Sequence, residues 1–273
     1  MAEAAAVYRE HAPSPALADL VECYWTIHAH LPAGETRPNR VLPDGCMDVI
    51  FDLGDPPLRG GCSLRSYAVG AMRQPLLTHL AGRVELVGVR FRPGGAPRLL
   101  GVAAHELADR TAPLHDLWHQ PGRDLEEAVA GAPAAERMRV LDAALLRRLG
   151  GGYRRDPAVA CAAALIARSG GRLPVRALHE PLGITRRHLE RIFAEAVGLT
   201  PKLACRVARF HAALRLMDGA PGLGWSRLAL EAGFYDQAHL IREFRDLSGL
   251  TPVALRAERG QVASVQDGGA AAA

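Results

Sequence analysis

The chain has 273 residues, of which 49% are hydrophobic, so it is long enough for two globular domains that each bury a core. Its formal charge of +4 is uneven: residues 1–150 carry 16 Arg against 18 Asp and Glu, a net −2, whereas residues 151–273 carry 17 Arg and Lys against 11 acidic residues, a net +6. This balance excludes a chain that is basic throughout and indicates a polyanionic partner for the C-terminal half only.

The cysteines and the N-terminus indicate a reduced, intracellular protein. The five cysteines are odd in number, widely spaced and without a C-x-x-C pair, which argues against a disulfide framework. The N-terminal residues carry charges where a signal peptide is apolar, and no run of 18 apolar residues occurs. We therefore expect a cytoplasmic protein without a membrane segment.

The region up to about residue 100 has the pattern of a β-rich domain. Its segments 23–31, 40–54 and 66–95 are short runs of apolar, β-branched and aromatic residues, broken by glycine and proline. Such runs predict several short strands in a small barrel or sandwich. Residues 1–20 are expected to form a loop and a short amphipathic piece.

From about Ala103 to residue 149 the pattern becomes helical. One apolar stripe is made by Met138, Leu141, Leu145 and Leu149, and it either packs on the barrel or forms a dimer surface, with intramolecular packing favoured. The G-G-G-Y-R-R-D-P stretch at 150–157 is the best candidate for a linker. Residues 1–150 are thus predicted to be a sensor or dimerisation domain, and the small and polar residues of 259–273 to be a disordered tail.

The stretch 224–252 predicts two helices joined by a tight turn. Trp225, Leu228 and Ala232 lie at helical spacing, and Gly233 ends the first helix because glycine takes a left-handed turn without steric cost. Asp236 is a suitable N-cap for a second helix, whose apolar face is Leu240, Phe244 and Leu247. A helix, a glycine turn and a second helix with a basic outer face are typical of a helix-turn-helix DNA reader.

The same unit occurs earlier in the chain, at 173–201. Gly183 matches Gly233 at an offset of 50 residues. At an offset of 51 the residues Leu189, Arg191, Phe193, Gly198, Thr200 and Pro201 match Leu240, Arg242, Phe244, Gly249, Thr251 and Pro252. Six spaced identities in a fixed order indicate a true internal repeat. Between the units, Thr200 and Pro201 begin a predicted helix at 200–217.

These two copies, and above all the string G-F-Y-D-Q-A-H-L-I-R-E-F-R-x-x-x-G-x-T-P, resemble the DNA-binding domain of AraC/XylS-type transcriptional regulators. The resemblance covers roughly residues 157–258. It implies helix-turn-helix units at about 173–198 and 225–249, a linker helix at 200–217, and recognition helices that enter two successive major grooves. It also implies a bacterial regulator with RNA polymerase as a partner, and whether that regulator is an activator or a repressor stays open. The strings L-P-D-G-C-M-D-V-I-F and G-V-R-F-R-P-G-G-A more weakly resemble an AraC-associated N-terminal domain.

In the first unit, Thr185 is the expected cap of the recognition helix. Arg187, Glu190 and Arg191 lie at i, i+3 and i+4, so together they can reach base edges, and the resemblance places them at base-reading positions. Glu190 either accepts from cytosine N4 or orients an arginine. Arg186 is expected either to contact phosphate or to have a packing role.

In the second unit, the matching positions make a more apolar reading face. The expected DNA-binding residues are Gln237, Ala238, His239, Ile241, Arg242 and Arg245. Gln237 can read adenine, and Arg242 can either read guanine or bind phosphate. Ala238 and Ile241 can offer only apolar contacts, for instance to thymine methyl groups. We therefore expect hydrogen-bonded specificity mainly from the first unit and positioning mainly from the second.

One departure from the family pattern affects the first unit. His179 stands where the family usually has alanine, and Pro181 lies in the last turn of the supporting helix. Because proline in a helix interior costs about 3 kcal/mol, that helix is expected to end early.

The N-terminal region contains the only group of residues that suggests other chemistry. It comprises His28, His30, Asp44, Cys46 and Asp48, whose spacing is not diagnostic of a metal, so neither a metal nor a cofactor is expected. Cys46 is either a redox or alkylation sensor or a buried inert thiol, and the inert thiol is the favoured alternative.

The overall prediction is an α+β chain in which a barrel-like domain precedes an all-α reader of double-stranded DNA. Its function is expected to be sequence-specific transcription regulation under a small-molecule or redox signal, with a homodimer as an open alternative. A catalytic barrel tethered to DNA and a non-specific architectural DNA binder are the other candidates. No nucleophile motif or phosphate-loop motif supports the catalytic alternative, so enzyme activity is not expected.

Overall fold

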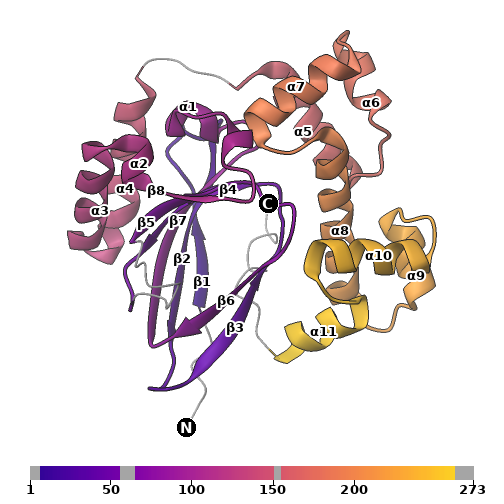
Figure 1. The fold of residues 1–273 in the computed structure, drawn as a ribbon, viewed down its shortest axis with the longest axis horizontal. Coiled ribbons are helices and arrows are strands. Elements are labelled where there is room, and N and C mark those ends of the chain that lie inside the picture. The colour runs from indigo at the N-terminus through magenta and orange to yellow at the C-terminus, as the bar shows by residue number, and fades with distance from the viewer. Residues whose placement is uncertain (1–6, 56–64, 151–154, 262–273) are drawn as a thin grey trace.

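The structure is a computed structural model that describes residues 7–55, 65–150 and 155–261. A β-rich part is followed by a helical part, which confirms the predicted fold class (Figure 1). The strands are β1 Val7–His11, β2 Val21–His30, β3 Thr36–Val41, β4 Met47–Asp52, β5 Ser66–Val69, β6 Leu76–Ala81, β7 Arg83–Phe91 and β8 Thr111–Pro113.

The strands form two antiparallel sheets. The larger sheet has the order β1-β2-β7-β4-β5-β8, and the smaller one pairs β3 with β6. The expectation of a loop over residues 1–20 is wrong for 7–11, which pair with β2 from Val7–His28 to His11–Tyr24. This edge strand is mostly exposed, so it lacks the apolar alternation by which a strand is recognised.

Strand β4 shows why the larger sheet has two different faces. Met47, Val49 and Phe51 point into the main core, whereas Asp48, Ile50 and Asp52 point the other way and line a cavity. The cavity is covered by residues of β3 and β6, such as Val41, Thr78 and Leu80. The two sheets therefore face each other across a partly hollow interior.

Helices cover the core face of the larger sheet. They are α1 Ala96–Leu100, η1 Ala104–Glu106, α2 Leu114–Trp118, α3 Gln120–Gly131, η2 Ala134–Glu136 and α4 Arg137–Leu149. The stripe of α4 packs inside the chain: Leu141, Leu145 and Leu149 are buried in the core cluster that contains Phe51 and Phe91. Intramolecular packing, the favoured alternative for this stripe, is confirmed.

The helical part contains α5 Pro157–Ser169, α6 Arg176–His179, η3 Glu180–Leu182, α7 Arg186–Val197, α8 Pro201–Gly219, α9 Trp225–Ala232, α10 Gln237–Ser248 and α11 Pro252–Gln261. Of the predicted linker, residues 151–154 lie outside the described residues, as do 262–273 of the predicted tail. The prediction of a disordered tail is wrong for 259–261, which continue the helix α11. None of the helices in the described ranges is long and apolar enough to cross a membrane.

The main core does not stop at the end of the β-rich part. The same cluster of buried residues continues through Val159, Ile166, Leu189 and Phe193 to Cys205. The C-terminal end of α7 abuts η1 so closely that a Cβ on Gly198 would lie 3.0 Å from the carbonyl oxygen of Ala104. A second cluster holds the helices α8 to α11 together and includes Leu42, the residue that follows β3.

Candidate DNA-binding interface

The second helix-turn-helix unit forms as its sequence predicts. Leu228 and Ala232 of α9 are buried, and Gly233 ends that helix in the left-handed region at φ +86°. The carboxylate of Asp236 then accepts a hydrogen bond of 2.6 Å from the backbone N–H of His239 and so caps α10. Leu240, Phe244 and Leu247 are fully buried, which turns the opposite side of α10 to solvent.

The first unit has the same arrangement as the second, but its supporting helix is shorter. Its supporting helix α6 ends at His179, and Pro181 lies in the single 3₁₀ turn η3, so the predicted early end is confirmed. The His179 ring contacts the backbone oxygen of Ile184 at 3.1 Å across this turn. Gly183 then takes φ +64°, and Thr185 caps α7 by accepting from the N–H of His188 at 3.2 Å.

The solvent-facing side of α7 carries the arginines expected to read DNA, and ion pairs hold some of them. Arg186 binds Glu190 at 2.8 Å and Arg191 binds Glu195 at 2.9 Å, all on the exposed surface. Arg187 is exposed and has no ion-pair partner among the described residues. The contact of Glu190 favours its role in orienting an arginine over accepting from a base.

The solvent-facing side of α10 presents Gln237, Ala238, Arg242 and Arg245 as exposed residues, with Ile241 half-buried. Gln237 is held by Ser226 of α9, whose hydroxyl donates to the amide oxygen at 2.9 Å. Within the described residues, no ion pair engages Arg242 or Arg245. Two guanidinium groups are thus available to an anionic partner.

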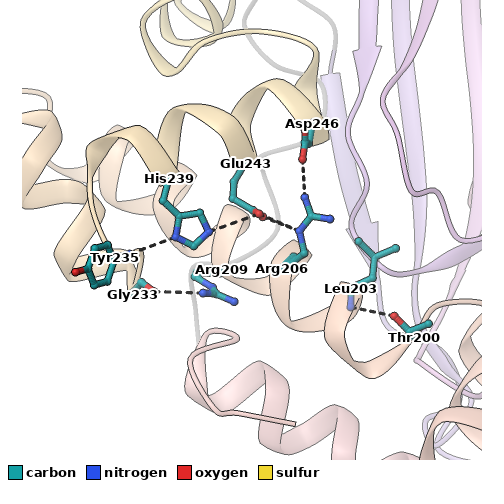
Figure 2. A network of polar contacts seen from close by, with 9 residues as sticks. All are labelled: Thr200, Leu203, Arg206, Arg209, Gly233, Tyr235, His239, Glu243 and Asp246. Atoms are coloured by element: carbon teal, nitrogen blue, oxygen red, sulfur yellow. Dashed lines mark hydrogen bonds and ion pairs between the residues drawn. The ribbon is translucent and has the colours of Figure 1, made fainter.

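His239 is placed differently from its neighbours. Its Nδ1 accepts from the backbone N–H of Tyr235 at 3.3 Å, and its Nε2 lies 3.6 Å from Glu243 (Figure 2). Glu243 and Asp246 also bind Arg206 of α8, at 2.9 and 2.8 Å. This network ties α10 to α8 and fixes the direction in which the reading side of α10 points.

Family comparisons agree with this construction. A family model described as "Helix-turn-helix domain" matches residues 178–258, and a model described as "Domain of unknown function (DUF6597)" matches residues 9–113. Residues 178–258 are an AraC-type helix-turn-helix domain. The chain is accordingly a DNA-binding protein of transcription regulation, with the domain of unknown function at its N-terminus. No curated protein matches the chain in sequence.

Among solved structures, the chain is similar to ToxT from Vibrio cholerae. A P21 crystal form is 12% identical, with a TM-score of 0.42, over 82% of this chain and 98% of that chain. ToxT with a bound unsaturated fatty acid is 11% identical, with a TM-score of 0.42, over 93% and 96% of the two chains.

The AraC-type domain is joined to the N-terminal domain by a contact that no sequence pattern predicts. Arg40 of β3 binds the carboxylate of Glu258 in α11 through two hydrogen bonds, and it also donates to the carbonyl oxygen of Ser248 at 2.9 Å. Leu42 is buried in the core of the second unit. His211 of α8 contacts the carbonyl oxygen of Pro43 at 2.7 Å. No local pattern signals such a contact, because its partners are about 170 to 220 residues apart.

The segment that makes this contact also borders the cavity of the N-terminal domain. Val41, Asp44 and Cys46 line the cavity, which has a volume of about 130 Å³, while Arg40 and Leu42 face the AraC-type domain. Residues 40–46, called the connecting segment below, therefore have the cavity on one side and the second helix-turn-helix unit on the other.

The other N-terminal candidates are only partly brought together. Asp44, Cys46 and Asp48 line the cavity, whereas His28 and His30 are exposed and do not. In the part of the chain that the structure describes, no three His, Cys, Asp or Glu side chains are grouped to hold a metal. Burial, with nearby Asp44 and Glu22, raises the pKa of the Cys46 thiol well above its ordinary value, so its thiolate is disfavoured.

Proposed function

We propose that this protein is a sequence-specific transcription regulator whose helices α7 and α10 enter two successive major grooves on one side of a DNA duplex. The observation that carries the proposal is the duplicated construction of the two units. Each has a left-handed glycine before a side-chain-capped helix with an exposed, arginine-bearing side. The linking helix α8 has 19 residues and so spans about 28 Å at roughly 1.5 Å per residue. This length suits readers about one turn of DNA, ~34 Å, apart.

The residues of the two reading sides have different chemistry. Arg187 and Arg191 can bind guanine O6 and N7 in bidentate geometry, and each good pair discriminates by about 1–3 kcal/mol. In the second unit, Gln237 suits adenine and Ala238 and Ile241 suit thymine methyl groups. Arg186, Arg242 and Arg245 supply charge for phosphates, with Thr185 capping and His239 holding the turn.

We further propose that a small molecule in the N-terminal cavity controls DNA binding through the connecting segment. Val41 and Asp44 share a short backbone segment with Arg40 and Leu42, so a ligand that shifts this segment also shifts the residues that contact the second unit. A redox signal at Cys46 is less favoured, because burial and neighbouring carboxylates oppose the reactive thiolate. RNA polymerase contact remains a prediction from the family resemblance, and a homodimer remains an open alternative.

A selection from random duplex DNA with the purified full chain tests the function, followed by a salt titration on the enriched sequence. Enrichment of two boxes about one helical turn apart is the expected result. Steep salt dependence without an enriched sequence would contradict the proposal and favour a non-specific architectural binder. The matched control is Arg123→Ala, which removes an exposed arginine of α3 away from both reading sides and should leave binding unchanged.

A further inference from the structure

The cavity of the N-terminal domain has a wall built around one tryptophan. Trp25 of β2 lies flat over Gly88 of β7, so closely that a Cβ on residue 88 would come within 2.0 Å of the indole ring. Tyr8 stacks on the indole, with 6.4 Å between ring centroids and 27° between planes. The indole Nε1–H donates to Oδ1 of Asp48 at 3.0 Å. The aromatic ring and the carboxylate are therefore held side by side.

Beside Trp25, two carboxylates share a single guanidinium group. Arg90 is shared by two carboxylates: its Nη2 lies 3.5 Å from Oδ2 of Asp44 and its Nε 3.4 Å from Oδ1 of Asp48. Both contacts of Asp48 use Oδ1, and Oδ2 has no hydrogen-bond partner among the described residues. Burial raises the pKa of Asp48 to about 6, although Arg90 opposes the shift. An uncompensated carboxylate in such a place attracts a cation.

The rest of the cavity is largely apolar. Ile27, Ile50, Val69 and Leu86 line it from the larger sheet, and Leu80 lines it from β6. Its volume of about 130 Å³ is close to that of an engineered cavity, about 150 Å³, that admits benzene. There is thus room for a single ring or a short branched chain beside the charged end.

We propose that this cavity binds a small organic cation, an amine with a compact apolar or aromatic body. The ammonium group lies at Oδ2 of Asp48, beside the indole of Trp25, since a carboxylate recognises such a group through a charge-assisted hydrogen bond. The apolar body fills the space lined by the aliphatic residues. This assignment rests on the proposed function in one respect, namely that the cavity is the site through which DNA binding is controlled.

The test is a charge series of three similar probes, titrated by calorimetry into the full chain at pH 7.5. They are 2-phenylethylamine, which is a cation, 2-phenylethanol, which is neutral, and 3-phenylpropionate, which is an anion. The amine is expected to bind at least about tenfold more tightly than either of the others, as a charge-assisted hydrogen bond implies. Equal or tighter binding of the alcohol or the anion would overturn the proposal, as would binding of none of the three at millimolar concentration.

A pair of isosteric variants locates the amine. Asp48→Asn keeps an oxygen to accept from Trp25 but removes the charge, so amine binding should weaken by about tenfold or more while binding of the alcohol changes little. Asp116→Asn removes an exposed carboxylate of α2 that does not line the cavity and should change neither. Equal amine binding by Asp48→Asn and wild type would overturn the placement. If Asp48→Asn does not fold, the charge series on the wild type still decides the ligand class.

A separate measurement keeps the ligand class apart from the control of DNA binding. The affinity of the full chain for its selected DNA site is measured with and without saturating amine. Amine binding without any change in DNA affinity supports the cation site and contradicts only the proposed control. A change in DNA affinity with the anion and not with the amine supports control through the cavity and overturns the cation assignment.

Discussion

Arg40 and Glu258, 218 residues apart, meet in a two-pronged ion pair, with Nε to Oε1 at 2.8 Å and Nη2 to Oε2 at 3.0 Å. The arginine side chain is 17% exposed and the glutamate 33%, so the pair is partly shielded from water. Because Arg40 also binds the carbonyl oxygen of Ser248 near the end of α10, this contact sets how the second reader rests on the N-terminal domain.

The first prediction concerns the strength of that pair. Arg40→Ala should lower the free energy of unfolding by about 1.5–3 kcal/mol, because Glu258 loses a charged partner. In a double-mutant cycle, Arg40→Ala combined with Glu258→Ala should cost less than the sum of the two single variants, as measured by urea unfolding. Arg227→Ala, which breaks the exposed pair with Glu231, should cost less than about 1 kcal/mol. Additive single effects would show that Arg40 and Glu258 do not interact in solution.

The second prediction is a loss of stability in acid that depends on His211. Burial lowers the pKa of this ring below its ordinary 6.5, so the folded state excludes a proton that the unfolded state takes up. Its contribution is therefore fully present above pH 6.5 and decreases as the pH falls below that value. His211→Gln, which retains an N–H for the oxygen of Pro43, should show a smaller decrease in Tm between pH 7.5 and 5.5.

The raised pKa of Asp48 acts in the opposite direction. Its folded form gains stability as the pH falls from about 6 towards the ordinary value of 3.8. The difference between wild type and His211→Gln at each pH removes this contribution, since both chains contain Asp48. A difference that does not change with pH would contradict the assignment to His211.

The third prediction compares the turn glycines of the two units. Gly183 and Gly233 both have positive φ, so Gly183→Ala and Gly233→Ala should each cost about 1 kcal/mol from backbone strain. A Cβ on residue 183 meets open space, whereas one on residue 233 would lie 2.5 Å from Cγ of Arg172. Gly233→Ala should therefore give the lower Tm by thermal unfolding. Adding Arg172→Ala should recover part of that extra loss, and no recovery would argue against the steric cause.

The fourth prediction separates the two reading sides. Arg191→Ala should relax base preference at one box, whereas Arg242→Ala should weaken binding to all sequences and reduce the salt slope by about one. Both effects are read from binding to a panel of single-base variants of the selected site. A larger loss of base preference for Arg242→Ala than for Arg191→Ala would reverse the assignment of specificity to the first unit.

The fifth prediction concerns the thiol of Cys46. Because burial and the carboxylates of Asp44 and Glu22 raise its pKa, iodoacetamide at pH 7.5 should modify it much more slowly than a model thiol peptide. Peptide mass spectrometry of the native chain measures the rate, and denatured chain is the control that restores ordinary reactivity. Rapid modification of the native protein would revive the redox-sensor hypothesis.

The sequence alone determined much of the AraC-type DNA-binding domain. Caps and turns are local devices, so the pattern around Gly233 and Asp236 predicted where α9 ends and α10 begins, and the repeat predicted the same for α7. Pro181 likewise signalled the early end of α6. The apolar stripes predicted which sides of these helices are buried, since helical periodicity relates spacing directly to direction.

Only the tertiary structure decided what the N-terminal residues do. Trp25, Asp48 and Arg90 come from three strands, and the antiparallel register that brings them together leaves no trace in local spacing. In β4, the alternation of Asp48, Ile50 and Asp52 does signal a face unlike the core, although not what that face surrounds. The pairing of Arg40 with Glu258 depends on how the two domains pack against each other. Because the two residues are 218 positions apart, no local sequence preference can specify their contact.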